Sequence, residues 1–261
     1  MADTTHEFPY TRYSADGIET GMDTIIREMP LTIYVNGEEL VTLLCSPEKT
    51  DELTAGFLWS EGVIDNKDEI TKIVVDEAKG AVWADITRDA EFIKNLMFKR
   101  LITSGCGKGT TFYNVVDSVS SKPVGKGFTV TPRQVLALMA EFQKTSELYK
   151  TTHGVHSAAL CSPDTIEIFR EDIGRHNAVD KILGYCLMND IDPASMALIS
   201  SGRVSSEVLL KAAKKGTQVL ISRTSPTDLG VRLADKLNVT LIGFVRGGRM
   251  TVYTHNERIV A

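Results

Sequence analysis

The second half of this chain alternates short apolar runs with amphipathic runs, and no other feature limits the possible folds as strongly. The apolar runs place Val, Ile and Leu on consecutive positions, which is typical of strands covered on both faces. The amphipathic runs repeat apolar residues with the period of a helix. The predicted strands are 157–162, 165–171, 196–202, 217–223, 239–245 and 250–255, and the predicted helices are 174–188, 205–216 and 225–238. This pattern predicts an α/β fold with helices on both faces of a sheet.

The first half of the chain follows a different pattern, which predicts a smaller α+β domain. Alternating apolar residues in 31–46 flank Asn36-Gly37, a strong signal for a two-residue hairpin turn. We therefore predict an N-terminal α+β domain over residues 1–125 and an α/β domain over 126–261, which opens with a helix over 131–150 capped by Thr131. Further predicted elements are a helix over 50–64 with Asp51 as its candidate N-cap, strands over 70–75 and 81–86, and a short helix near 89–97.

The cysteines and the N-terminal segment indicate a cytoplasmic protein. The four cysteines are widely spaced and form no CxxC pair, which argues against a disulfide framework and a four-thiolate zinc site. The first 20 residues lack the basic and apolar regions of a secretory signal, so we expect a partly ordered leader. No apolar run approaches the roughly 18 residues that a membrane span requires. The sequence thus predicts a protein of the reducing cytoplasm, with no membrane as a partner.

The charge distribution favours an anionic ligand in the second half of the chain. The net charge of −5 argues against general nucleic-acid binding. Residues 1–150 hold 16 Lys and Arg against 23 Asp and Glu, whereas residues 151–261 hold 13 against 11. The second half is therefore the better host for an anion.

Polar turns rich in Arg, Ser and Gly follow three strands of the predicted sheet. They should lie at the carboxyl edge, where open α/β folds bind ligands. Two of the turns lead into helix N-termini, whose free N–H groups favour phosphate, and arginine donates paired bonds to phosphate oxygens. Ordinary loops with solvated arginines are the alternative, but three such turns favour a nucleotide or pyrophosphate-bearing ligand. The candidate binding residues are Ser201, Gly202, Arg203, Ser222, Arg223, Thr224, Ser225, Phe244, Val245, Arg246, Gly247, Gly248 and Arg249.

Three of the five histidines lie in two further polar segments, residues 153–156 and 170–177. A metal site is one interpretation, but the spacing from His153 to His156 is poor for a helix and no pair of thiols lies nearby. We therefore predict no metal bound by the protein. Asp172 is predicted to orient Arg175 or His176, or to bond ligand hydroxyls, and a purely structural polar network is the alternative.

One cysteine, Cys106, lies in a segment without large apolar side chains, TSGCGKGTT at 103–111. Such a segment suits neither a core strand nor a helix interior, so we predict an exposed and mobile loop. Lys108 would favour the nucleophilic thiolate, and the neighbouring glycines would let the thiol move. An incidental free cysteine is the alternative. The remaining cysteines fall in or at the ends of apolar elements and are predicted to be packing residues: Cys45, Cys161 and Cys186.

A series of longer motifs runs in order through most of the chain. The longest is REDIGRHNAVDKILG at 170–184, whose pattern REDxGRHNAxDK is specific. The others are PLTIYVNGEEL (30–40), LxxGFLxxEG (53–62), SGCG (104–107), GVHSAAL (154–160), SGRVSSE (201–207), SRTSPTDLGVRLA (222–234) and GFVRGGRMTVYT (243–254). Together these segments resemble the FdhD family, the sulfur carrier proteins required for formate dehydrogenase activity.

The resemblance implies a fold and a task. The second domain would be a cytidine-deaminase-like α/β/α sandwich, and the protein would be a homodimer. It would accept sulfane sulfur from a cysteine desulfurase as a persulfide on Cys106. It would then sulfurate the bis-molybdopterin guanine dinucleotide molybdenum cofactor before that cofactor enters formate dehydrogenase. The stretch from Phe244 to Arg249 would match the family's cofactor-binding stretch, and the guanine dinucleotide suits the arginines at the strand ends.

The chain departs from the family at one position of the loop. Many members have a CxxC pair there, whereas this chain has Gly109 in place of the second cysteine. One cysteine suffices to hold a persulfide, but it cannot release sulfur by forming an internal disulfide. A non-catalytic molybdenum-cofactor chaperone is therefore the alternative function. A nucleoside deaminase is rejected, because its HxE and PCxxC motifs are missing from the sequence.

Overall fold

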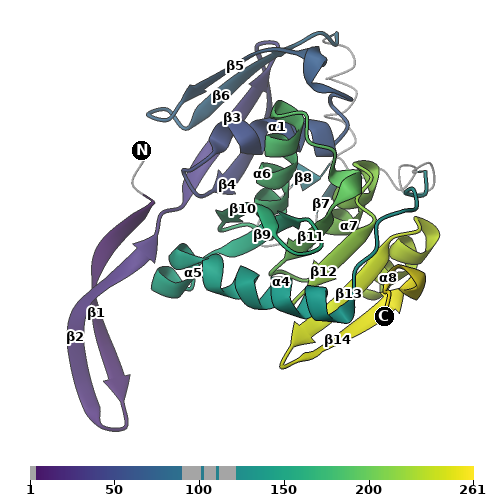
Figure 1. Ribbon diagram of the computed structural model, residues 1–261. Helices are drawn as coiled ribbons and strands as arrows, with labels where there is room; N and C mark the ends of the chain where they lie inside the picture. The colour runs from purple at the N-terminus through teal and green to yellow at the C-terminus, as the bar shows by residue number, and fades with distance from the viewer. Residues whose placement is uncertain (1–3, 90–100, 103–109, 112–121) are drawn as a thin grey trace.

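The computed structural model describes residues 4–89, 101–102, 110–111 and 122–261, and its centre is a six-stranded sheet (Figure 1). The strands lie in the order β10-β9-β11-β12-β13-β14. Strands β11, β12 and β13 are parallel, and the other pairs are antiparallel. The sheet contains every strand predicted for the second half, which confirms the α/β class. Its strands are β9 (His156–Cys161), β10 (Ile166–Asp172), β11 (Ala197–Ser200), β12 (Val219–Ser222), β13 (Thr240–Arg246) and β14 (Arg249–Thr254).

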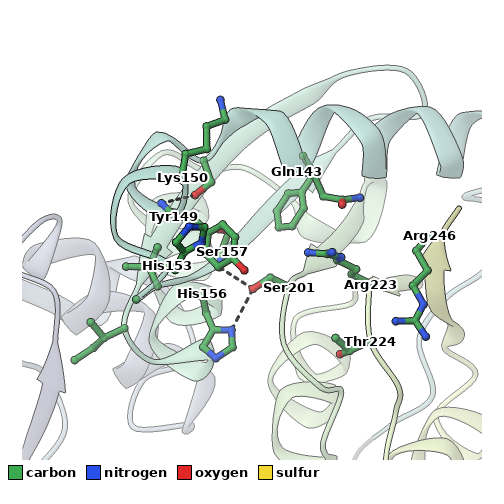
Figure 2. A pocket seen from close by; sticks show the side chains of 15 residues that line it. Gln143, Tyr149, Lys150, His153, His156, Ser157, Ser201, Arg223, Thr224 and Arg246 are labelled. Carbon is green, nitrogen blue, oxygen red and sulfur yellow. Dashed lines mark hydrogen bonds between the residues drawn. The ribbon is translucent and has the colours of Figure 1, made fainter. Parts of the chain in front are cut away.

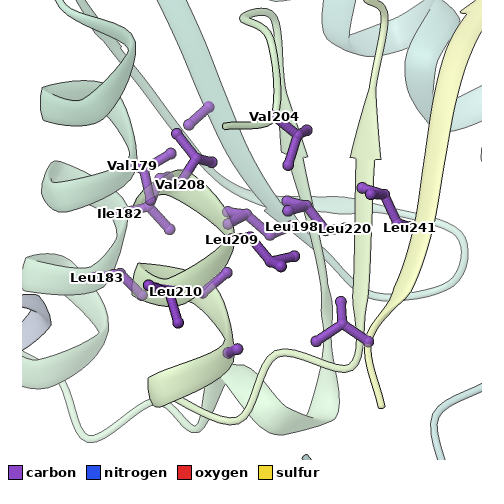
Figure 3. Packing of buried hydrophobic residues seen from close by; sticks show 14 of the residues in the cluster. Val179, Ile182, Leu183, Leu198, Val204, Val208, Leu209, Leu210, Leu220 and Leu241 are labelled. Atoms are coloured by element: carbon purple, nitrogen blue, oxygen red, sulfur yellow. The ribbon is translucent and has the colours of Figure 1, made fainter. Parts of the chain in front are cut away.

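Helices cover both faces of this sheet because its strands bury side chains in both directions. Leu198 and Leu220 pack on the face covered by α6, α7 and α8 (Figure 3). Ile199 and Ile221, the next residue on each strand, pack on the other face with α4. Burying each of these side chains contributes roughly 1.5–3 kcal/mol. The helices are α4 (Pro132–Thr145), α5 (Glu147–Thr152), α6 (Arg175–Met188), α7 (Ser206–Lys214) and α8 (Asp228–Lys236), with short turns η2 (Pro193–Ser195) and η3 (Asn256–Arg258).

The first half of the chain forms a four-stranded mixed sheet in the order β4-β3-β6-β5, packed against helix α1. The hairpin turn is where the sequence predicts it, and both of its residues have positive φ, 50° at Asn36 and 86° at Gly37. The two predicted strands that follow are also present. The elements are β3 (Met29–Val35), β4 (Glu38–Cys45), α1 (Thr50–Ser60), η1 (Lys67–Glu69), β5 (Ile70–Asp76) and β6 (Ala81–Ile86).

Helix α1 of the first half packs against α6 of the second half with their backbones in contact. A Cβ atom on Gly56 would lie 1.7 Å from the carbonyl oxygen of Asp180, and one on Gly184 would lie 1.8 Å from that of Glu52. Only glycine permits so close an approach. The contact between α1 and α6 therefore joins the two halves of the chain. The domain boundary predicted at residue 125 stays a prediction.

Two predictions about helix ends are wrong. The N-cap of α1 is Lys49, with φ 57°, and Asp51 lies in the first turn, where a carboxylate favours the helix dipole. The single helix expected over 131–150 is two helices, because Ser146 has a non-helical backbone (φ −74°, ψ 95°). Its hydroxyl accepts a hydrogen bond from the Tyr149 N–H at 3.0 Å and starts α5. The start of α4 is as predicted, since Thr131 and Gln134 form a capping box.

Residues 5–26 form a hairpin that extends from the body of the molecule (Figure 1), so the expectation of a partly ordered leader is wrong for these residues. Strands β1 (Thr5–Ser14) and β2 (Gly17–Ile26) pair along their whole length. Cross-strand contacts stabilise it, such as the Tyr10 hydroxyl donating to Glu19 at 2.7 Å. Most of its side chains are exposed, including the apolar Phe8, Ile18 and Met22, and its apolar residues do not alternate regularly enough to predict a half-buried strand.

Two predicted features lie outside the described residues. Cys106 belongs to residues 103–109, and most of the short helix expected near 89–97 belongs to residues 90–100. At the end of the predicted loop, β8 (Thr110–Thr111) pairs with β7 (Leu101–Ile102) in an antiparallel ladder. Of the helices that the structure describes, none has the length and apolar character needed to cross a membrane.

Candidate functional site

A cavity of about 750 Å³ opens beside the carboxyl ends of the three parallel strands (Figure 2). Ser201 follows β11, Arg223 and Thr224 follow β12, and Arg246 ends β13. The strand-end turns therefore meet at one cavity. The rest of its wall comes from α4, α5 and the segments around β9, through Phe142, Gln143, Ser146, Tyr149, Lys150, His153, Gly154, Val155, His156, Ser157 and Ile173.

Several of the predicted binding residues shape the turns and do not line the cavity. The buried Ser222 hydroxyl donates to the carbonyl oxygen of Gly202 at 2.8 Å, and its oxygen lies 3.0 Å from the Thr224 N–H. Gly202 leaves room for Arg175, since a Cβ there would lie 2.9 Å from the Arg175 side chain. The first two turns are thus fixed side by side. The other candidates outside the lining are Arg203, Ser225, Phe244, Val245, Gly247, Gly248 and Arg249.

The cations of the cavity are exposed and, within the described part of the chain, Arg223 and Arg246 take part in no ion pair. The Arg246 guanidinium lies over the Phe244 ring, 5.5 Å from its centroid, a contact that orients the arginine. Phe244 has φ 51°, and the pairing of β13 with β14 is irregular between Gly243 and Arg246. Strain of this kind is typical of functional sites. The cavity therefore suits an anion with several oxygen atoms.

Sequence reasoning missed the helical wall of the cavity. The break at Ser146 redirects the chain, so that Tyr149, Lys150 and His153 line the cavity together. The Tyr149 and His153 rings meet edge to face, with centroids 5.1 Å apart. The local signal was Ser146-Glu147, because serine caps helices and glutamate favours their first turn. An uninterrupted apolar periodicity through residue 142 concealed that second start.

Two histidines lie in polar surroundings near the strand ends. His156 Nδ1 is 3.2 Å from the Ser201 hydroxyl oxygen, which accepts the Ser157 N–H at 2.9 Å (Figure 2). Burial, then the charge of Arg175 and His176, holds the pKa of His156 below its usual range. His176 Nε2 is 3.0 Å from Glu207 Oε2. Burial raises the pKa of Glu207, but the bond from His176 and the charges of His176, Arg175 and Lys211 together outweigh burial and keep that pKa below its usual range.

Asp172 belongs to a buried polar network within the described part of the chain, which supports the structural alternative. One of its oxygens accepts from the Ser46 N–H and hydroxyl and lies 2.7 Å from Lys181 Nζ. The other accepts from the Gly174 N–H and from Asn177, at 2.9 and 2.8 Å. The carboxylate is fully buried, so these bonds leave it no role toward a ligand. Among the described residues, no group of three His, Cys, Asp or Glu could hold a metal ion.

The three described cysteines are packing residues, as predicted. Cys45, Cys161 and Cys186 are each fully buried in an apolar cluster. Burial raises the pKa of each thiol to about 12. At neutral pH such thiols are protonated and therefore poor nucleophiles. The candidate nucleophile Cys106 lies outside the described residues.

Comparison with known proteins identifies relatives over nearly the whole chain. Residues 26–260 match the model of the FdhD/NarQ family. The chain is 46% identical over 248 residues to the sulfur carrier protein FdhD of Bacillus licheniformis, covering 95% of this chain and 94% of the relative. It is 42% identical over 252 residues to the protein of that name from Staphylococcus aureus, covering 97% and 95%.

The fold also matches a solved structure. The crystal structure of a formate dehydrogenase accessory protein from Desulfotalea psychrophila superimposes with a TM-score of 0.80 at 25% sequence identity. The match covers 99% of this chain and 100% of the other. Both the sequence and the fold therefore lead to one assignment. The chain belongs to the FdhD/NarQ family.

Proposed function

We propose that this protein is a cytoplasmic sulfur carrier that serves formate dehydrogenase. It takes sulfane sulfur from a cysteine desulfurase as a persulfide on Cys106. It then passes this sulfur to the bis-molybdopterin guanine dinucleotide cofactor, which is its cargo and not a resident group. The observation that carries the proposal is the full-length similarity to proteins named sulfur carrier protein FdhD.

The loading step needs a thiolate that can reach the donor. The Cys106 thiolate attacks the terminal sulfur of the desulfurase persulfide, a new S–S bond forms on Cys106, and the desulfurase thiolate leaves. Lys108 supports this role, since a nearby cation favours the thiolate. The other three thiols are buried and have pKa values raised to about 12, which makes them unsuitable for the step.

The cavity supports the cargo part of the proposal. Arg223 and Arg246 supply charged donors for the phosphates of the guanine dinucleotide, and Ser201 and Thr224 supply hydroxyls. The volume of about 750 Å³ lies within the range of small-molecule sites, roughly 300–1,000 Å³. The cavity therefore suits one nucleotide portion of the cargo, and a homodimer would present two such cavities.

A non-catalytic chaperone is the second candidate, and the glycine at position 109 favours it. Releasing a terminal persulfide sulfur as sulfide consumes two electrons, which a second loop cysteine would supply by forming a disulfide with Cys106. With Gly109 there, the electrons must come from a thiol or acceptor outside the loop. A protein that only binds and delivers the cofactor would not face this requirement.

Mass spectrometry after incubation with a desulfurase and cysteine separates the two candidates. The sulfur carrier gains the mass of one sulfur atom on Cys106, and the other cysteines stay unmodified. The Cys106→Ala variant should neither take up sulfur nor support formate dehydrogenase maturation. Maturation by a Cys106→Ala variant that carries no sulfur would overturn the sulfur-carrier assignment and favour the chaperone. The matched control is Cys186→Ala, a buried thiol whose loss should leave sulfur uptake unchanged.

A further inference from the structure

We propose that His156 contacts the anionic ligand of the cavity and takes up a proton when that ligand binds, an inference that rests on the proposed function of the cavity. His156 begins β9 and lines the cavity together with Ser201, Arg223 and Arg246. It therefore belongs to the same surface as the two exposed arginines. It differs from them because its charge changes near neutral pH.

Ser201 holds one nitrogen of the imidazole in the free protein. The Ser201 oxygen accepts the Ser157 N–H at 2.9 Å and forms a hydrogen bond with His156 Nδ1, 3.2 Å away, in which the tautomer of the ring sets which atom is the donor. Either neutral tautomer leaves the second ring nitrogen, Nε2, outside this contact. Within the described part of the chain, Nε2 has no hydrogen-bond partner, and it is not among the buried polar atoms. This nitrogen is thus available to a ligand.

Burial and the charges around the ring keep it neutral while the cavity holds no anion. Burial disfavours a proton on His156 most strongly, and Arg175 and His176 at the start of α6 act in the same direction. Asp172 acts in the opposite direction, but Lys181 at 2.7 Å balances its charge. Among the described residues, the other ionisable side chains near the ring or around the cavity are Glu171 on β10, Tyr149 and Lys150 on α5, His153 after α5, Arg223 after β12 and Arg246 on β13.

A phosphate-bearing ligand would reverse this balance. Its negative charge favours the imidazolium, so the pKa of His156 should be higher in the complex than in the free protein. Binding then draws in a proton at any pH between those two values. Affinity should rise as pH falls through the pKa of the complex, and level off below the pKa of the free protein. A fully charged arginine in the same place would give no such dependence.

Calorimetry with a nucleotide of constant charge tests the inference. GDP-mannose is suitable because its pyrophosphate is a diester, with no group of its own that titrates between about pH 5.5 and 8. Titrations in buffers with different ionisation enthalpies report the protons taken up for each nucleotide bound. We expect net uptake near pH 6.5 and an affinity about tenfold higher at pH 5.5 than at pH 8.

Two histidine variants identify the group. His156→Gln should abolish the proton uptake and flatten the pH dependence, whereas His6→Gln, at an exposed histidine of β1 that does not line the cavity, should leave both unchanged. Proton uptake that persists at wild-type level in His156→Gln would overturn the inference.

A measurement on the unmodified protein covers the case in which a variant fails to fold. NMR titration of the imidazole C–H signals should give a higher pKa for His156 with GDP-mannose bound than without it. An equal pKa in both states would contradict the inference. Failure of GDP-mannose to bind at any pH would instead count against a nucleotide site in this cavity. The two failures are therefore distinguishable.

Discussion

The cavity at the strand ends and the junction between α1 and α6 both collect charged side chains, but they differ in how the charge is balanced. At the junction, Lys211 Nζ lies 2.6 Å from Glu61 and 2.9 Å from Asp180, and all three side chains are buried. Burial lowers the pKa of Lys211, yet the two carboxylates outweigh it and raise that pKa above its usual range. In the cavity, Arg223 and Arg246 are exposed to solvent.

This difference separates a structural use of charge from a binding use. Buried charges are tolerated only when they are paired and hydrogen-bonded, so the junction is complete without a ligand. Exposed arginines remain hydrated at little cost and keep their donors available for an incoming anion. Substitutions in the junction should therefore change the free energy of unfolding, whereas those in the cavity should change binding.

The largest effect should come from breaking the junction charges with Lys211→Met. The carboxylates of Asp180 and Glu61 would be left buried without a counter-charge, and we expect a loss of about 3–5 kcal/mol in the free energy of unfolding, measured with urea. The loss should shrink as pH falls, because protonation of a buried carboxylate removes the uncompensated charge. Lys67→Met is the control, since the Lys67–Asp190 pair is exposed and should contribute only about 0–1 kcal/mol. A similar loss in both variants would contradict the comparison.

The next largest loss of stability should come from disrupting the close contact between Gly184 and the backbone of α1 at the same junction. Gly184→Ala places a Cβ 1.8 Å from a backbone oxygen of α1, so the helices must separate. We expect a loss of about 3 kcal/mol in the free energy of unfolding, at the upper end of the cost of overpacking. Gly125→Ala is the control, because nothing lies within 4 Å of a Cβ there. If Gly184→Ala is as stable as this control, the two helices do not pack through their backbones.

On the other side of the comparison, Arg246→Ala should weaken guanine nucleotide binding by about 1.5–3 kcal/mol, the contribution of a hydrogen bond to a charged group. The free energy of unfolding should change by less than about 0.5 kcal/mol, because the side chain is exposed. Arg203→Ala is the control, an exposed strand-end arginine that does not line the cavity. Calorimetry showing equal affinity in the two variants would remove Arg246 from the binding site.

The smallest effect should be the alkylation of the buried thiols in the folded protein. In the folded protein near pH 8, iodoacetamide should leave Cys45, Cys161 and Cys186 unmodified, since burial raises the pKa of each to about 12. In urea all the thiols should react, which provides the control. Alkylation of a buried thiol in the native protein at the rate seen in urea would mean that its core opens readily. Mass spectrometry of digested peptides gives the modified positions.

Much of the fold could be predicted from the sequence because hydrophobic periodicity is a local property. The alternation of apolar and amphipathic runs predicts each strand of the six-stranded sheet, and Asn36-Gly37 predicts the turn of the first hairpin. The turns after β11, β12 and β13 could be placed at one edge because the carboxyl ends of parallel strands meet there. The N-terminal hairpin was missed because the apolar residues of its two strands do not alternate regularly with polar ones.

The sequence by itself determined the order of the elements, the family and the strand-end arginines near the cavity. Only the tertiary structure decided which polar side chains form bonds within the protein and are therefore not available to a ligand. Asp172 looked available for a ligand, but it bonds Ser46, 126 positions away in the chain, and is saturated there. The helix break at Ser146 brings Tyr149 and Lys150 to the cavity. There the Ser146 hydroxyl also donates a hydrogen bond to Glu171 of strand β10. Such pairings depend on distances between remote segments, and these exist only once the sheets and helices have packed together.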